Sequence, residues 1–492
     1  MYKTNAGQAS LFDDPANFIG ARLNPNNRWV QMSSMIPWDL LDEKYNAQFR
    51  NKKVGNPAKA ARMALGSHII KEKFGISDQE TVEHIKESPY LQWFIGLPEF
   101  TDKAPFDAST MTWFRKRLTP EILEEVNSYI IGTASKDKDD QDQNPENSGS
   151  SSSDAHRSDP ADTNKGTLIL DATCAPSDIR FPTDVSLLNE AREKSEMLIL
   201  TLHRQSEKGV KAPRTYKKQA RRDYLRFARS KKPTIQKIRK AIRQQLGYVR
   251  RNLKTIGSLL EKGYHLSDRD QVLLGTLETL YSQQEEMYRN RKHQVAGRIV
   301  SIHQPWIRPI VRGKTNAPVE FGAKVAISMV DGYAQIEKLD WNPFNESTTL
   351  METVERYRAK TGCYPARILG DKIYRTRENL NYCKSKGIHM NGPKLGRPPS
   401  NKTLYREQCL QEKSEAGERN AVESKFGEGK RSYGLGRLYA KRQDTSETNI
   451  HLVFLVMNLE KRLRVFFRPL FRILGYRIYL FKSTINGAQM AV

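Results

Sequence analysis

A polar stretch in the first third of the chain, residues 135–164, most constrains how this sequence can fold. It is rich in Ser, Asp, Asn and Gln, contains a run of four serines and has almost no apolar side chains. Such a segment buries too little surface to offset its ordering entropy, which predicts a flexible linker. We therefore expect a domain of residues 1–133, a linker of residues 134–165 and a second domain of residues 166–482. A flexible tail, residues 483–492, would follow.

Residues 56–132 carry start signals for several short helices. Ser77 and Glu80 form a capping-box pattern, in which each side chain accepts a hydrogen bond from the backbone of the other residue. A later helix begins near Asp107 and ends in three consecutive basic residues. Small helices with an aromatic core and a basic tip favour a helix-turn-helix-like DNA-binding domain. A plain helical bundle with a solvated basic end is an equal alternative.

The second region begins with an apolar run that ends on a carboxylate, residues 167–171. The four residues before Asp171 suit a strand that is covered on both faces. An Asp at the end of such a strand lies at the rim of the sheet, where it can reach a cation or a substrate. For one run alone, an Asp that simply ends a strand or begins a turn is the commoner interpretation.

A long helical stretch follows and carries most of the positive charge. Residues 204–254 contain nineteen Lys and Arg against Glu207 and Asp223, in a chain whose net charge is +25. This excess favours nucleic acid or an anionic membrane surface, because each cation that neutralises a phosphate releases counterions. Aromatic residues are interleaved, as in surfaces that follow a nucleic-acid backbone. The candidate contacts are Lys217, Lys218, Arg221 and Arg222.

After this stretch the apolar pattern becomes that of strands. A tight hairpin is expected at Asp331–Gly332, and a later short strand, residues 365–371, ends in a second Asp. If the two Asp-terminated strands are parallel neighbours, Asp171 and Asp371 lie side by side. Carboxylates that close repel each other, and a divalent metal ion is the usual resolution. The other expected strands are residues 298–302, 306–311, 321–330 and 333–339.

A third carboxylate lies on a helical face later in the chain. Arg419, Glu423, Phe426 and Lys430 follow a four, three, four spacing, which puts them on one side of a helix. An ordinary amphipathic helix with an Arg/Glu pair has the same spacing. Glu423 is nevertheless the best candidate to complete a metal site.

These segments together resemble the bacterial insertion-sequence transposases of the DDE type. The resemblance is to the group whose catalytic Glu lies in an Arg-x3-Glu-x6-Lys helix, a spacing found here at Arg419, Glu423 and Lys430. One departure is Ala416, where many relatives carry Tyr. The matching segments, in chain order, are residues 74–117, 171–173 with 182–184, 370–374, 422–427 and 433–435.

The resemblance implies an α/β fold with a ribonuclease H-like mixed sheet. A long basic helical insertion at about 185–297 would interrupt this sheet, and an all-α N-terminal DNA-binding domain would precede it. Asp171, Asp371 and Glu423 would be catalytic and would bind two Mg²⁺ ions, with Mn²⁺ as an alternative. One ion would activate water and later a DNA 3′-hydroxyl, and the other would stabilise the leaving oxygen. The enzyme would cut DNA at the ends of the element and join the 3′-hydroxyl to target DNA.

The resemblance also implies the contacts with DNA. Arg419 and Lys430 would bind phosphate near the scissile bond. Residues 56–132 would recognise the terminal inverted repeats, and residues 204–254 would grip flanking or target backbone. Because two DNA ends are cut, we expect a homodimer or a larger synaptic complex. The expected contacts in the first of these regions are Arg115, Lys116 and Arg117.

Two other functions are compatible with the basic segments. A non-catalytic DNA-binding regulator derived from a transposase would need the cations, but it gives no reason for the two strand-end aspartates. A ribonuclease H-like nuclease would cut DNA without strand transfer.

Cysteine spacing and hydropathy indicate the compartment. The four cysteines form no CxxC pair and no zinc-like cluster, so neither a disulfide nor a zinc framework is expected. The N-terminus has no basic-then-apolar signal pattern, and the apolar run at 451–458 is too short to span a bilayer. We expect a cytoplasmic, nucleoid-associated protein without membrane contact.

Overall fold

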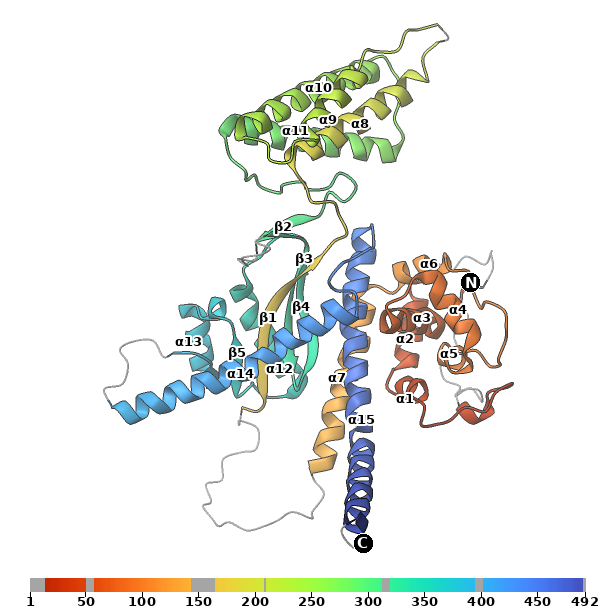
Figure 1. The fold of residues 1–492 in the computed structure, drawn as a ribbon, viewed down its shortest axis with the longest axis vertical. Helices are drawn as coiled ribbons and strands as arrows, with labels where there is room; N and C mark the ends of the chain where they lie inside the picture. The colour runs from red at the N-terminus through yellow and green to blue at the C-terminus, as the bar shows by residue number, and fades with distance from the viewer. Residues whose placement is uncertain are drawn as a thin grey trace.

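The structure, a computed structural model, describes residues 14–49, 57–142, 164–207, 209–311, 319–393 and 401–489. Figure 1 shows a mixed sheet with its helices in the centre and a group of N-terminal helices beside it. A bundle of helices projects from one end of the molecule. The fold is therefore mixed α/β.

A mixed sheet organises the centre of the molecule. β3 is antiparallel to β1, β2 and β4, whereas β5 is parallel to both β1 and β6. The strand order is β2–β3–β1–β5–β6, and β4 pairs with the part of β3 that β2 leaves open. The strands are β1 (Thr167–Pro176), β2 (Arg308–Val311), β3 (Val319–Val330), β4 (Tyr333–Asp340), β5 (Arg367–Gly370) and β6 (His389–Met390). The connections after β4 contain η3 (Glu346–Thr349), α12 (Leu350–Thr361), η4 (Lys372–Tyr374) and α13 (Arg377–Ser385).

β1 does not end at Asp171, which corrects the expectation from its sequence. The strand continues to Pro176 because β3 supplies an antiparallel partner from Ile169 onwards. The parallel pairing with β5 stops earlier, at Leu170 and Gly370. Asp171 therefore lies in the middle of β1, at the point where its parallel neighbour ends.

The hairpin between β3 and β4 forms as predicted. Asp331 and Gly332 have φ values of 53° and 77°, as a two-residue type I′ turn requires. The predicted strand at 298–302 is wrong. Ile299 donates its backbone N–H to the Gln283 side chain (2.9 Å) and not to a neighbouring strand, and its own side chain packs against helices.

The helical insertion between β1 and β2 has a hydrophobic core of its own. Buried Leu, Ile and Val side chains of its helices form this core, and among the described residues no strand of the sheet contributes to it. Asp184 accepts hydrogen bonds from Gln284 (3.0 Å) and Arg298 (2.7 Å), which ties together the two connections to the sheet. The helices are α8 (Asp184–His203), α9 (Lys217–Ala228), α10 (Ile235–Glu261) and α11 (Asp268–Asn290).

Two boundaries among the N-terminal helices follow local signals, whereas the helix expected near Asp107 begins at Thr110. The capping box of α4 is formed, because Ser77 donates its N–H to Glu80 Oε2 (2.8 Å) and Glu80 donates its N–H to Ser77 Oγ (3.2 Å). Gly75, with φ 66°, ends α3 in the left-handed conformation. The helices are α1 (Arg28–Ser34), α2 (Trp38–Asn46), α3 (Ala61–Phe74), α4 (Asp78–Glu87), α5 (Pro89–Phe94), α6 (Thr110–Arg117) and α7 (Pro120–Asp142).

Two C-terminal helices join these parts. α14 (Lys402–Ser432) packs on β1 and β5, and α15 (Gln443–Gln489) packs on α3, α7 and β4. One continuous core includes N-terminal helices, the sheet and α15. At its centre the buried Asn458 side chain donates to Asn127 Oδ1 (2.8 Å) and to the Ala334 carbonyl (2.7 Å). The N-terminal helices and the sheet thus share one packed body.

Two expected boundaries fall inside helices. α7 runs to Asp142, into the expected linker, because residues 133–144 contain neither Gly nor Pro to stop it. α15 runs to Gln489, into the expected tail. The rest of that linker, residues 143–163, and the last tail residues, 490–492, lie outside the described residues. In the part of the chain that the structure describes, no helix has the length and apolarity needed to cross a membrane.

Candidate active site

Two carboxylates occupy neighbouring positions on the sheet. Asp171 in β1 and Asp371 directly after β5 follow the last pair of the parallel ladder, Leu170 and Gly370. The Asp171 side chain is largely buried, with 17% of its surface exposed. Asp371 is exposed and caps η4 through its own side chain, which accepts from the Lys372 N–H (2.7 Å). The register therefore puts these two aspartates next to each other.

Asp171 lies in an environment that favours added positive charge. Burial raises the pKa of its carboxyl to about 6, and the carboxylates of Glu346 and Asp371 act in the same direction. The Ala172 backbone N–H (2.8 Å) and the Arg419 guanidinium oppose this rise. A proton or a cation is therefore favoured at this position.

Arg419 stands between Asp171 and the third candidate carboxylate, Glu423. Its Nη1 lies 3.6 Å from Asp171 Oδ2, and its Nη2 lies 3.3 Å from Glu423 Oε1. Arg419 and Glu423 are one turn apart on α14. The Glu423 side chain is 58% exposed, and that of Arg419 only 22%. One guanidinium thus connects a buried carboxylate of the sheet to an exposed carboxylate of the helix.

Anchors along α14 hold Arg419 at the level of Asp171. Val422 is fully buried in the main core on one side of the helix. On the side facing β5 and β6, Glu418 pairs with Arg367 (2.9 Å) and Glu415 pairs with His389 (2.7 Å). These contacts fix the rotation of α14, so that Arg419 faces β1.

Glu346, a fourth carboxylate near Asp171, was not predicted from the sequence. It is 16% exposed and pairs with Lys324 of β3 at 2.8 Å. The buried Asn379 amide holds η3 against η4, because it donates to the carbonyls of Ser347 (2.9 Å) and Tyr374 (2.8 Å). An acidic residue at the start of a helix is an ordinary feature of helix termini, so its sequence signal was weak.

The donor groups suit a hard divalent cation, which prefers carboxylate oxygens. Within the residues that the structure describes, however, no three Asp, Glu, His or Cys side chains lie close enough to hold a metal ion. Arg419 occupies the position between Asp171 and Glu423. The carboxylates therefore fit a divalent ion by their chemistry, and in this conformation the Arg419 guanidinium lies between two of them.

Two family models match this chain, in different parts of the fold. The model described as "Transposase domain (DUF772)" matches residues 17–117, which include α1 to α6. The model described as "Transposase DDE domain" matches residues 368–460, which include Asp371, Glu423 and α14. Both models describe transposase domains, and the two matches together support an insertion-sequence DDE transposase.

A curated relative matches part of the chain. It is "Uncharacterized protein ORF8 in nfe locus" of Rhizobium meliloti, which is 39% identical over 132 residues. The match covers 27% of this chain and 61% of the relative, so the chain spans less than two thirds of the relative's length. No solved structure matches the chain.

The last residue of the Arg/Glu/Lys face lies toward the insertion. Lys430 Nζ is 3.9 Å from Glu320 Oε2, and the Lys430 side chain is 25% exposed. Glu320 pairs with β2 at the end of β3 where the chain returns from the insertion. The α14 surface therefore leads from Arg419 toward the basic helices of the insertion.

The basic triplet at the end of α6 mainly holds the N-terminal helices together. Arg115 is 9% exposed, and its Nη2 lies 2.8 and 2.9 Å from the two Asp78 carboxylate oxygens. Arg117 lies over the Phe49 ring (4.4 Å). Arg115 is thus unavailable to DNA in this conformation, because the turn of α6 directs it toward α4. The partly exposed members of the triplet are Lys116 and Arg117.

The charges of the N-terminal region are balanced, which the triplet alone does not reveal. Residues 57–133 carry nine Lys or Arg and eleven Asp or Glu. The exposed side of α4 is acidic and presents Glu80, Glu83 and Glu87. Counting the charged residues of the whole region could have revealed this balance from the sequence. The balance argues against strong attraction of phosphate by these helices.

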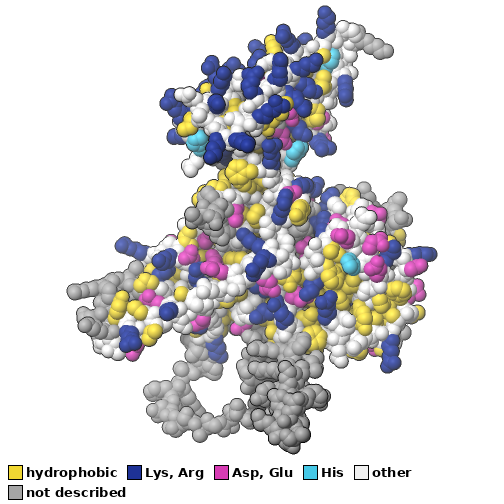
Figure 2. Space-filling view, viewed as in Figure 1, with side chains coloured by type: hydrophobic (Ala, Val, Ile, Leu, Met, Phe, Trp, Pro, Cys, Tyr) yellow, Lys and Arg dark blue, Asp and Glu magenta, His cyan; other side chains and the backbone are white. Residues whose placement is uncertain are grey.

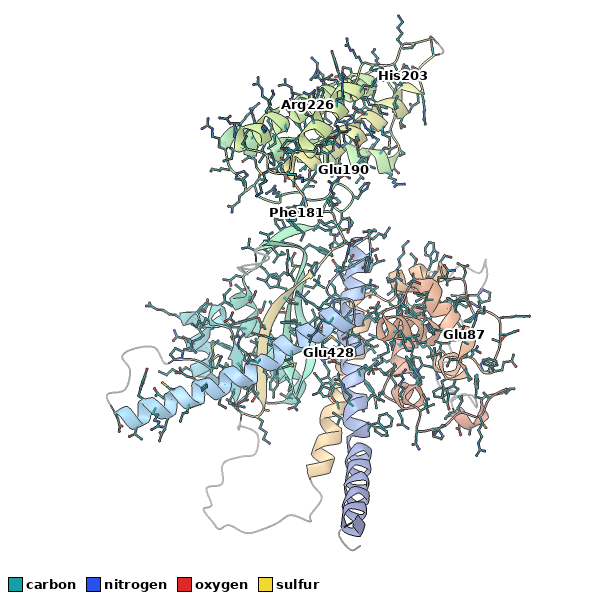
Figure 3. All side chains as sticks on the ribbon, in the orientation of Figure 1. Glu87, Phe181, Glu190, His203, Arg226 and Glu428 are labelled. Carbon is teal, nitrogen blue, oxygen red and sulfur yellow. The ribbon has the colours of Figure 1, made fainter. Side chains whose placement is uncertain are left out.

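The insertion, by contrast, presents a dense field of cations. Figure 2 shows Lys and Arg side chains gathered over its surface, with few acidic side chains among them. The four predicted contacts on α9 are all exposed, and Figure 3 shows Arg226 on the same bundle of helices. Those four contacts are Lys217, Lys218, Arg221 and Arg222.

The interleaved aromatic residues of the insertion serve mainly in packing. Tyr248 is 8% exposed, and its hydroxyl donates to Asp223 (2.9 Å). Tyr216 is 38% exposed, but its ring lies near the guanidinium groups of Arg214 (4.5 Å) and Arg251 (4.8 Å). The surface of the insertion is therefore dominated by charge.

Proposed function

We propose that this transposase cuts DNA at the ends of an insertion sequence and joins the released 3′-hydroxyl to target DNA. The observation that carries the proposal is the meeting of Asp171, Asp371 and the Arg419/Glu423 pair on β1, β5 and α14. The sheet supports the ribonuclease H-like fold that the resemblance implies. Its central strand β1 has antiparallel strands on one side and parallel strands on the other.

Asp171, Asp371 and Glu423 are the proposed ligands of two Mg²⁺ ions, for which Mn²⁺ is an alternative. When bound, such ions supply a Lewis acid that activates water or a 3′-hydroxyl and stabilises the leaving oxygen. Asp171 must be ionised to act as a ligand, and its pKa of about 6 sets this ionisation just below neutral pH. Glu346 adds a further negative charge beside Asp171.

Arg419 and Lys430 are the proposed phosphate contacts of α14. Arg419 would use its two-pronged guanidinium, and Lys430 would act as a point charge. A strand that passes both residues continues toward the insertion, whose exposed cations would grip the backbone without reading bases. This path would join the carboxylates to the insertion, where residues 204–254 carry nineteen Lys and Arg against two acidic residues.

Recognition of the terminal inverted repeats is the proposed role of the N-terminal helices. Lys116 and Arg117 are the basic contacts that remain for it. Because the charge of this region is balanced, recognition would depend on contacts with base edges more than on attraction of phosphate. Since two DNA ends must be cut together, a homodimer or a larger synaptic complex is the proposed assembly.

A cleavage assay tests the proposal against its alternatives. We expect the full chain to cut DNA that carries the element ends in Mg²⁺ and to form joined products. Asp171→Asn, Asp371→Asn and Glu423→Gln should each slow cleavage by roughly a thousandfold or more, because each removes several kcal/mol of transition-state stabilisation. The matched control is Glu418→Gln on the same helix, which loses only the pair with Arg367 and should stay active.

Each other outcome selects another function. If cleavage survives all three substitutions, these carboxylates are not catalytic. Tight binding without any cleavage by the unmodified chain would favour the regulator. Cleavage without joined products would favour the nuclease.

A further inference from the structure

Arg419 is the cation that lies between Asp171 and Glu423, two of the three proposed metal ligands. We infer that Arg419 is a built-in counter-ion, which competes with divalent metal for these carboxylates and is freed for phosphate when metal binds. The inference rests on the proposed function of the same site. It adds a link between metal binding and DNA binding that the proposed roles do not contain.

Among the described residues, Arg419 contacts two carboxylates of the site. Its two terminal nitrogens point to different partners, Asp171 Oδ2 at 3.6 Å and Glu423 Oε1 at 3.3 Å. The Arg419 side chain is 22% exposed and that of Asp171 is 17% exposed, so neither side chain is fully solvated. A partly buried carboxylate needs a compensating charge, and Arg419 supplies it here.

Two other cations near the site, Lys324 and Lys430, are held by other groups. Lys324 pairs with Glu346 (2.8 Å) and donates to the Phe344 carbonyl (2.8 Å). Lys430 lies 3.9 Å from Glu320. Among the described residues, the printed ion pairs of Asp171 and Glu423 are with Arg419, and a divalent ion between the two carboxylates would duplicate its charge.

Arg419 is held loosely compared with a structural arginine of the same chain. Arg115 binds both oxygens of Asp78 at 2.8 and 2.9 Å and is 9% exposed. Arg419 makes one long contact with Asp171 and one contact within its own helix. Displacing it therefore breaks no bidentate pair and leaves α14 in place.

The consequence is positive coupling between two ligands. Metal that binds Asp171 and Glu423 releases a guanidinium fork beside the same carboxylates, where it can bind a phosphate. By thermodynamic reciprocity, DNA that holds Arg419 must strengthen metal binding by the same factor.

Mn²⁺ binding to the full chain without DNA, measured by titration calorimetry, tests the inference. Arg419→Gln removes the competing charge and should tighten Mn²⁺ binding roughly tenfold. Arg419→Lys keeps the charge but loses the fork, so its affinity should lie between those of the unmodified chain and Arg419→Gln. The matched control is Arg367→Gln. Arg367 lies on β5 opposite α14 and pairs with Glu418, which is not a proposed metal ligand. Its loss removes the same charge and should change the Mn²⁺ affinity less than about twofold.

A second measurement uses Arg419→Ala and guanidinium chloride at a non-denaturing concentration. Free guanidinium should weaken Mn²⁺ binding to this variant and leave the unmodified chain unchanged. Circular dichroism verifies that each variant is folded. If Arg419→Gln does not fold, the comparison is made with Arg419→Lys instead.

The outcomes separate this inference from the proposed function. One outcome is that Asp171→Asn abolishes Mn²⁺ binding while Arg419→Gln leaves it unchanged or weaker. This result would support the metal site but would show that Arg419 does not compete with the metal ion. Failure of both the unmodified chain and Arg419→Gln to bind millimolar Mn²⁺ would reject both. Binding by Arg419→Gln alone would be the strongest support for competition.

Discussion

The N-terminal helices and the helices of the insertion are both amphipathic, yet they differ in what they bury and expose. The N-terminal helices share their core with the sheet and α15. The insertion has a separate core and joins the sheet through two connections. In the first region Arg115 is paired with Asp78 inside the fold, whereas in the second the cations of α9 are exposed. A paired charge stabilises its own fold, and an exposed one is available to a partner.

This difference shows why a short basic motif is a poor guide to a DNA surface. The triplet at 115–117 lies in a region with nine basic and eleven acidic residues. The stretch at 204–254 has nineteen basic residues against two acidic ones, so its helices cannot pair most of their cations internally. The two segments therefore differ in the ratio of basic to acidic residues in the surrounding region, and not in how closely their own basic residues are spaced.

The largest expected effect is on non-specific DNA affinity. Replacing four exposed cations of α9 with Gln should weaken binding of a random duplex by up to about a thousandfold near 0.1 M salt. The slope of log affinity against log salt should fall by up to about 3.6, because each lost phosphate contact contributes about 0.9. Fluorescence anisotropy across a salt series measures both quantities. The four substitutions are at Lys217, Lys218, Arg221 and Arg222.

The matched control removes the same charge from the N-terminal region. It should weaken binding less than tenfold and leave the salt slope almost unchanged. A loss as large as that of the α9 variant would mean that both regions track phosphate and would end the distinction between them. The control substitutions are at Lys44, Lys59, Lys86 and Lys103.

Local patterns predicted much of the site, and long-range pairing determined the rest. The helical face of Arg419 and Glu423 and the strand before Asp371 follow from periodicity and turn residues, which act over a few positions. The end of β1 could not be predicted this way, since it depends on β3, more than 140 residues later in the chain. Glu346 carries no distinct local signal, because its proximity to Asp171 arises from tertiary packing.

The shared core is the clearest case of information that local patterns lack. The polar linker suggested independent domains, but Asn458 bonds to Asn127 before the linker and to Ala334 after it. An apolar run such as 451–458 predicts that these residues are buried, but it does not indicate which helices or strands they pack against. Only the assembled fold reveals that α15 packs against both parts.

The second prediction concerns the Asn458 hydrogen bonds that connect α15 to α7 and β4. Asn458→Ala removes hydrogen bonds from buried Asn127 and Ala334 and should lower the free energy of unfolding of the shared body by about 2–4 kcal/mol. Hydrogen exchange should show faster exchange in α3, α7 and β4 but little change in α10. The reciprocal control is Asn252→Ala, because the buried Asn252 donates to Ser195 (2.9 Å) within the insertion. Equal effects of both variants in both regions would indicate a single cooperative unit.

The smallest expected effect concerns Arg115. Arg115→Gln should lower the free energy of unfolding by about 2 kcal/mol, because it leaves the partly buried Asp78 with Lys71 as its remaining cationic partner. It should leave the salt dependence of DNA binding unchanged, whereas a phosphate contact would reduce the slope by about 0.9. Chemical denaturation and anisotropy on the same variant separate these roles.

Acid titration sharpens the same test. Burial would raise the pKa of Asp78, but Lys71 and Arg115 outweigh it and hold this pKa below its usual value. A carboxyl with a lowered folded-state pKa stabilises the fold above the unfolded pKa of about 4 and loses this contribution as the pH falls through its folded value. The stability difference between the unmodified chain and Arg115→Gln should therefore be complete at pH 7 and shrink below about pH 4. A difference that persists unchanged in acid would mean that Arg115 stabilises α6 through packing of its side chain, not through its charge.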